Sequence, residues 1–105
     1  MNKIKAIVKR PDEKFGHVTY ISNTLKNFQR IVDGPIEVVH LSDNAVLVCN
    51  EEGKLRGLQK NFILGPIRRD VIVGEAIVVG TDGEEFSDCP INLVTWKALL
   101  DYWGN

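Results

Sequence analysis

Hydrophobic and polar residues alternate in the first part of the chain, which is the pattern of β-strands with two unlike faces. Residues 3–9 place Ile4, Ala6 and Val8 on one face and mostly lysines on the other. Residues 17–21 have the β-branched and aromatic content of a second strand. The stretch between the two is rich in turn-forming residues, so we expect them to form a hairpin.

The same alternation returns at residues 36–41 and leads into the centre of the chain. Residues 45–49, Ala-Val-Leu-Val-Cys, are apolar at consecutive positions, which indicates a strand buried on both faces in the middle of a sheet. Asp43 and Asn44 tolerate positive φ and predict a two-residue hairpin turn between these strands. A polar turn at residues 50–53 ends the second strand.

An amphipathic helix is predicted between the two hairpins. Residues 22–24 offer three candidate N-caps, Ser, Asn and Thr. Apolar side chains then recur with helical spacing at Leu25, Phe28, Ile31 and Val32. Gly34 is expected to take the left-handed conformation that ends the helix, and Pro35 blocks its continuation.

A second helix is predicted near the end of the sequence. Asp88 or Cys89 is expected near its N-cap, with Pro90 in its first turn. Its apolar residues are Leu93, Trp96, Leu100 and Trp103.

The segment between residues 54 and 66 has no regular period, so we expect an ordered loop with one short helical turn, pinned by Leu58 and Phe62. Residues 70–80 form the longest apolar run, and Gly74 within it predicts a bulge or a close approach of another part of the chain.

Residues 81–84 predict a further hairpin turn, which returns through residues 85–86. The element order is then β-β-α-β-β-loop-β-β-α. We expect one α+β domain spanning residues 1–105, with a mostly antiparallel sheet and two amphipathic helices to cover it.

Composition narrows the class of protein. The formal net charge of −1 argues against a general nucleic-acid coat, which would be basic. No apolar run approaches the ~20 residues of a membrane helix, and the first residues lack the apolar core of a signal peptide, so we expect a cytoplasmic protein without a membrane partner. Cys49 and Cys89 are predicted to be buried reduced thiols. They have no metal-ligand spacing with the histidines, so we expect no metal and no cofactor.

Polar and basic residues concentrate after the central strands. The candidate ligand-binding residues are Asn50, Glu51, Glu52, Lys54, Arg56, Asn61, Arg68 and Arg69. Their carboxylates and amides would accept hydrogen bonds, and their cations would meet an anion. The competing interpretation is an ordinary polar turn and a solvated basic face, with Asn61 holding the loop to the sheet. No phosphate-binding glycine motif accompanies the cations.

A catalytic constellation is not recognisable. His17 and His40 lie on predicted strands, and no nucleophile elbow is present. Adjacent carboxylates on a turn, such as Glu51 and Glu52, rarely face one another. We therefore expect a protein that is not an enzyme.

The last helix carries three aromatic residues that predict either of two roles. Trp96, Tyr102 and Trp103 can close the core, or they can anchor an interface with a second copy or another protein.

One string in the middle of the chain has a wider resemblance. The residues Ile-Glu-Val-Val from Ile36, and Val-Leu-Val-Cys-Asn-Glu-Glu-Gly-Lys-Leu from Val46, resemble a family of small uncharacterised proteins of phages, plasmids and integrated elements of Gram-positive bacteria. The similarity extends over about residues 18–86. It implies an accessory role in a mobile element. The pair Arg68-Arg69 and the tryptophan-rich final helix depart from the family's pattern.

Two functional hypotheses follow. The first is a non-enzymatic module that binds a small anionic ligand of nucleotide type and thereby sequesters a host defence signal, with the site between copies of a homo-oligomer. The alternative is a module that binds and inhibits a host protein, or a structural homo-oligomer.

Overall fold

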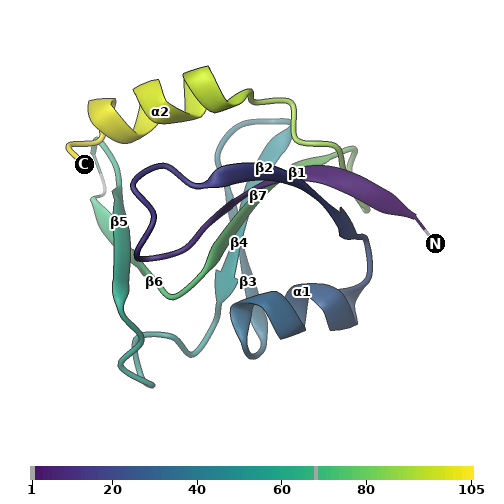
Figure 1. The fold of residues 1–105 in the computed structure, drawn as a ribbon, viewed down its shortest axis with the longest axis horizontal. Coiled ribbons are helices and arrows are strands. Elements are labelled where there is room, and N and C mark those ends of the chain that lie inside the picture. The colour runs from purple at the N-terminus through teal and green to yellow at the C-terminus, as the bar shows by residue number, and fades with distance from the viewer. Residues whose placement is uncertain (1, 68) are drawn as a thin grey trace.

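The computed structural model describes residues 2–67 and 69–105, and in that part of the chain eight strands and two helices form an α+β fold (Figure 1). The strands are β1 (Lys3–Lys9), β2 (His17–Ser22), β3 (Ile36–His40), β4 (Ala45–Asn50), β5 (Lys60–Leu64), β6 (Asp70–Val73), β7 (Ala76–Thr81) and β8 (Phe86–Ser87). The helices are α1 (Leu25–Val32) and α2 (Leu93–Tyr102).

The strands form two antiparallel sheets. The larger has the order β2-β1-β7-β4-β3, with the short β8 also paired to β7, and the smaller contains β5 and β6. Helix α1 lies on one side of the larger sheet and α2 on the other, so both faces of the sheet are covered (Figure 1). The strand order makes β2 and β3 the outer strands of this sheet. The expected α+β class with antiparallel pairing is confirmed. Neither helix in the described residues has the length and apolar content needed to cross a membrane.

The face beneath α1 carries the first of two hydrophobic cores. Phe28 and Val32 of the helix are buried at 0% and 1% exposure, and they pack on alternate residues of the sheet. Phe28 also meets the Phe86 ring, with centroids 4.8 Å apart. Because the helix is short, its stability comes mainly from this packing rather than from helix propensity.

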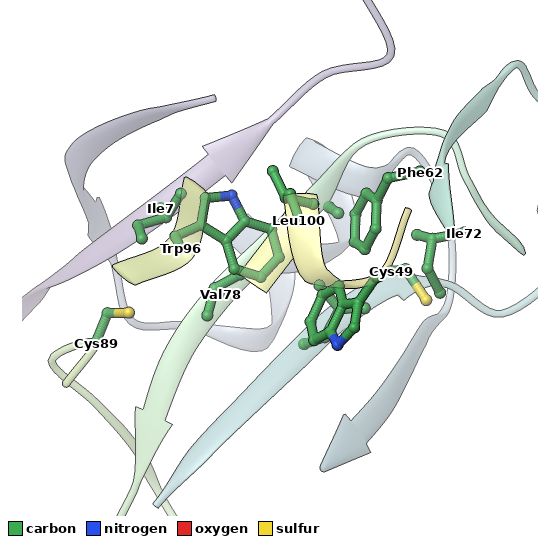
Figure 2. Close-up of a cluster of buried hydrophobic side chains, with 11 residues drawn as sticks. Ile7, Cys49, Phe62, Ile72, Val78, Cys89, Trp96 and Leu100 are labelled. Atoms are coloured by element: carbon green, nitrogen blue, oxygen red, sulfur yellow. The ribbon is translucent and has the colours of Figure 1, made fainter. Parts of the chain in front are cut away.

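The opposite face carries the second core, which joins α2 and the small sheet to the larger sheet (Figure 2). The Phe62 ring of β5 meets Trp96 edge-on at 5.6 Å and stacks on Trp103 at 6.4 Å. The indole N–H of Trp96 donates to the Phe15 carbonyl at 2.9 Å, so this fully buried ring has its polar atom satisfied. These aromatic contacts fasten the small sheet to α2.

Several expected elements are confirmed. β1 and β2 form a hairpin, and all six residues of β4 are buried. Thr24 is the N-cap of α1, and its hydroxyl accepts from the Asn27 N–H at 3.1 Å. Cys49 and Cys89 are buried free thiols.

The end of α1 differs from the prediction. Asp33, not Gly34, adopts the left-handed conformation, with φ of 63°. A short polar side chain tolerates this conformation. Arg56 also binds both the Asp33 carbonyl and its carboxylate, which stabilises the cap.

The start of α2 was also predicted too early. The N-cap is Asn92, whose side chain accepts from the Thr95 N–H at 2.8 Å. Asp88 and Cys89 instead bond to the backbone of β1: the Lys5 N–H donates to Asp88 Oδ1 at 2.7 Å, and the Cys89 N–H donates to the Lys5 carbonyl at 2.8 Å. These long-range bonds leave no visible signal in the local sequence.

The segment after β4 is more regular than expected. Residues 60–64 form β5, where a loop was predicted, and Phe62 is the residue that strand buries. The run 70–80 divides at Gly74 into β6 and β7, which belong to different sheets. Gly74 has φ of 74°, and a Cβ there would lie 2.9 Å from Leu58 Cδ1, so the expected close approach is confirmed.

The turn between β3 and β4 is longer than predicted. The N–H of Leu41 donates to the Ala45 carbonyl at 2.9 Å, which closes the hairpin around three residues, 42–44, instead of two.

Candidate functional site

Asn50, the first of the predicted ligand-binding residues, is 4% exposed and bonds within the fold. Its amide nitrogen donates to the carbonyls of Val32 and Asp33 at 2.9 and 3.1 Å, and its oxygen accepts from the Glu52 N–H at 2.7 Å. Asn50 therefore ties the end of α1 to the turn after β4.

Asn61 also bonds within the fold. Its amide nitrogen donates to the carbonyls of Lys9 and Gly74, each at 2.7 Å, and its oxygen accepts from the Lys9 ammonium at 2.6 Å. Lys9 is 4% exposed, and burial lowers its pKa, while Glu13 and Asp12 oppose that effect. This arrangement agrees with the structural role that the sequence offered for Asn61.

The predicted cations point to three separate places. Lys54 Nζ lies 2.7 Å from Asp70 Oδ1, and this hydrogen bond raises the pKa of Lys54. Arg56 binds Asp33 at the end of α1, with its second nitrogen 2.9 Å from the carboxylate. The Arg69 guanidinium is 3.4 Å from the Trp103 carbonyl at the end of α2. The described cations therefore do not converge on one hollow, and Arg68 lies outside the described residues.

A groove does lie beside the predicted loop. It has a volume of about 110 Å³ and runs between β3 and β4 on one side and β6 on the other. Its polar lining includes Glu37, Glu51 and Asp70 together with Lys54, so three carboxylates face one ammonium among the described lining residues. Of the predicted ligand-binding residues, Asn50, Glu51 and Lys54 line the groove. Glu52 is exposed and lies outside the groove.

The groove has an apolar floor. Val39 of β3, Cys49 of β4 and Ile72 of β6 contribute to it. Cys49 is 5% exposed, and burial, with smaller contributions from Glu37 and Asp70, raises the pKa of its thiol to about 11. A protonated thiol of this kind is a weak nucleophile. The chemistry that the groove offers is thus shape, apolar contact and negative charge.

The strand on the groove's outer side, β3, has an edge to which no described strand pairs. Hydrogen-bonded pairs alternate along an antiparallel ladder. Because the Leu41 N–H bonds to the Ala45 carbonyl on β4, the backbone N–H and C=O groups of the odd-numbered residues of β3 point toward β4. The N–H and C=O groups that point outward belong to Ile36, Val38 and His40.

A second hollow, of about 260 Å³, lies at the first turn of α1. It is lined by Ser22, Thr24, Lys26, Asn27 and Arg30, with no carboxylate among these residues. The Arg30 guanidinium is oriented by Asn27 Oδ1 at 2.7 Å. Helix N-termini favour anions, and here two cations add to that field.

The three predicted interface residues divide between core and surface. Trp96 and Trp103 are 0% and 7% exposed and belong to the core around α2, whereas Tyr102 is 70% exposed. The core interpretation therefore applies to both tryptophans, and Tyr102 remains available for an interface.

Sequence reasoning missed Glu37, Asp70 and the hollow of Lys26 and Arg30. Glu37 and Asp70 are 33 positions apart and meet only because two sheets pack together. For the hollow, a signal was available: the capped helix start is followed by cations and has no acidic residue in its first turn.

The histidines and acidic residues form no metal centre in the part of the chain that the structure describes. His17 Nδ1 lies 2.8 Å from Glu13 Oε2 at an exposed position, and His40 is on the outer edge of β3.

The fold and its groove define a small α+β protein with an acidic groove next to an open strand edge. The chain belongs to the family described as Domain of unknown function (DUF3846), which matches residues 4–101. No curated protein and no solved structure matches it.

Proposed function

We propose that this protein is not an enzyme and acts by binding another protein through the outer edge of β3 and the adjoining groove. The observation that supports the proposal is the position of the outer edge of β3, to which no described strand pairs, beside a groove built by both sheets. An extended segment that adds to such an edge gains main-chain hydrogen bonds, while pockets beside the edge read its side chains.

The character of β3 supports this mode of binding. Three of its residues turn backbone N–H and C=O groups outward, and Val38 among them is 41% exposed. Natural proteins usually block a strand edge with lysines, proline, a bulge or a covering loop, because an open edge pairs with other chains. β3, with the sequence Ile-Glu-Val-Val-His, contains no lysine and no proline, and its one acidic side chain, Glu37, lines the groove.

Paired proline variants test the proposal. Val38→Pro removes an N–H group that points outward from β3. Val18→Pro makes the same change on β2, because the register with β1 also directs the backbone N–H of Val18 away from the sheet. We expect the wild type and Val18→Pro to retain a stoichiometric protein from lysate of the host, and Val38→Pro to lose it. Circular dichroism of both variants checks that they fold. Equal capture by both variants, or no stoichiometric partner for the wild type, would contradict the proposal.

A second candidate function is the binding of a small anion of nucleotide type. The hollow at the first turn of α1 supports it, because Lys26 and Arg30 can contact a phosphate group there and the described lining residues include no carboxylate. The groove is less suited to an anion because carboxylates predominate in it.

Titration calorimetry with cyclic and linear nucleotides tests this candidate. Lys26→Ala is expected to weaken binding, and Lys60→Ala, an exposed change on β5, serves as the control. No heat from any nucleotide at high protein concentration would refute it.

The proposed setting is an accessory role in a phage or other mobile element, in the cytoplasm of the host cell. This setting is supported by the resemblance of the central strands to proteins of such elements. If the bound molecule is a defence signal, expression of the chain is expected to restore plating of a sensitive phage on a host that uses that signal. Unchanged plating would argue against sequestration.

Self-association through the other edge of the sheet is the remaining proposal. On β2, Val18 and Tyr20 are 44% and 63% exposed on one face, beside backbone groups that point outward. Sedimentation of the wild type and of Tyr20→Ser tests it, and a monomeric wild type at high concentration would exclude a stable homo-oligomer.

A further inference from the structure

We infer that the groove selects a partner segment carrying a lysine or arginine opposite Glu37. The inference rests on the proposed binding at β3 and adds the chemistry by which the partner is recognised.

The register of β3 determines where a partner's side chains fall. Glu37 and Val39 line the groove, while Val38 points to the face covered by α1. A strand added to the outer edge alternates in the same way, so its residues opposite Glu37 and Val39 lie over the groove. Directly opposed side chains have Cβ atoms about 4.5–5.5 Å apart, which is within reach of a salt bridge.

The charge and size of the groove favour a long cationic side chain. Glu37, Glu51 and Asp70 outnumber Lys54, which is itself bonded to Asp70. The alkyl stem of a lysine or arginine can lie on the apolar floor while its charged end reaches the carboxylates. The volume of about 110 Å³ is well below the roughly 300 Å³ of the smallest ordinary ligand pockets, so it suits one side chain.

The outer strands of the larger sheet in a second copy do not supply that side chain. The other outer strand of the sheet, β2, reads His-Val-Thr-Tyr-Ile-Ser and contains no lysine or arginine. β3 itself offers Glu37, which would bring carboxylates toward an acidic groove. In the small sheet β5 carries Lys60, but the backbone of Ile63 on its outer edge is bonded to the Asn105 side chain. The occupant that the charges favour is therefore a segment of a different protein.

Three synthetic peptides test the inference. Each has nine residues that alternate threonine and valine, with lysine, norleucine or glutamate at the centre, and each is titrated into the ¹⁵N-labelled full chain. We expect amide shifts at Ile36, Val38 and His40, with the lysine peptide binding about tenfold more tightly than the norleucine peptide. In Glu37→Lys, an exposed change, we expect the preference to reverse toward the glutamate peptide.

The outcomes separate the inference from the function on which it rests. If lysine and norleucine peptides bind β3 equally, or if Glu37→Lys leaves the preference unchanged, the inferred selection of a cation is overturned while binding at the edge stands. If no peptide shifts the amides of β3, or if shifts are confined to β2, the proposed docking at β3 fails as well.

Discussion

Asn50 offers the sharpest test of the structure, because the sequence suggested that it binds a ligand and its contacts suggest that it stabilises the fold. Asn50→Ala removes three hydrogen bonds, to the carbonyls of Val32 and Asp33 and to the Glu52 N–H. Each such bond contributes about 1 kcal/mol, and a buried group left without a partner costs about 1–3 kcal/mol. We therefore expect the free energy of unfolding to fall by about 3 kcal/mol, a large share of the roughly 5–15 kcal/mol of a typical domain.

Urea denaturation followed by tryptophan fluorescence measures this loss, since Trp96 and Trp103 are both buried. With an m-value of roughly 1–3 kcal/mol/M, the midpoint is expected to shift by about 1–3 M while the slope stays constant. Gln59→Ala, which removes an exposed amide side chain from the same segment, is the matched control and should change stability by less than about 0.5 kcal/mol.

A carboxylate at the same position sharpens the comparison. Asn50→Asp keeps an acceptor for the Glu52 N–H but directs a negative charge at two carbonyl oxygens at the end of α1. At neutral pH it should be at least as unstable as Asn50→Ala. A loss below about 1 kcal/mol for either variant would refute the structural role of Asn50.

Three further predictions concern packing and burial. Gly80→Ala would place a Cβ 2.3 Å from the Asp88 carbonyl oxygen, so it should lower the free energy of unfolding, measured by thermal unfolding, by about 1–3 kcal/mol. In the control Gly65→Ala the nearest contact of the new Cβ would be 3.5 Å, so stability should change little. Equal effects of the two substitutions would contradict the close approach at Gly80. Cys49 should resist thiol reagents in the native protein at pH 8. Burial raises the pKa of the Cys49 thiol from 9.0 to about 11, so its contribution to stability is fully present below pH 9 and is lost as pH rises toward 11. In Cys49→Ala the free energy of unfolding should therefore decline less over that pH range. Trp103→Ala should cost about 3–5 kcal/mol and Tyr102→Ala little, and similar losses for both would argue against their assigned positions in core and surface.

Local patterns in the sequence were sufficient for most of the fold. Full burial of β4 follows from five consecutive apolar residues, and the Thr24 cap follows from its side chain. The errors arose where distant contacts decide the outcome. β5 was read as a loop because Phe62 finds its partners on α2, and α2 starts late because Asp88 is held by β1.

The candidate site was less predictable than the fold. The polar loop does border a groove, but Asn50 and the two described arginines bond to backbone groups at the ends of α1 and α2, and Asn61 bonds to the carbonyls of Lys9 and Gly74. Sequence spacing does not reveal these contacts. The groove's charge depends on Glu37 and Asp70, which are brought together by the packing of two sheets. Tertiary structure, rather than the local pattern, thus determines the sign of the charge that the site presents.

The shape of the groove depends on closely packed backbone at two glycines, whereas its charge depends on side chains at its rim. A Cβ at Gly53 would lie 2.7 Å from Val73 Cγ2, and one at Gly74 would lie 2.9 Å from Leu58 Cδ1, so the backbone beside the groove is packed closely against these side chains. Glu37 and Glu51, by contrast, project from exposed positions at its rim. The charge that the groove presents can therefore be changed by substituting rim residues alone, while the backbone that shapes the groove stays the same.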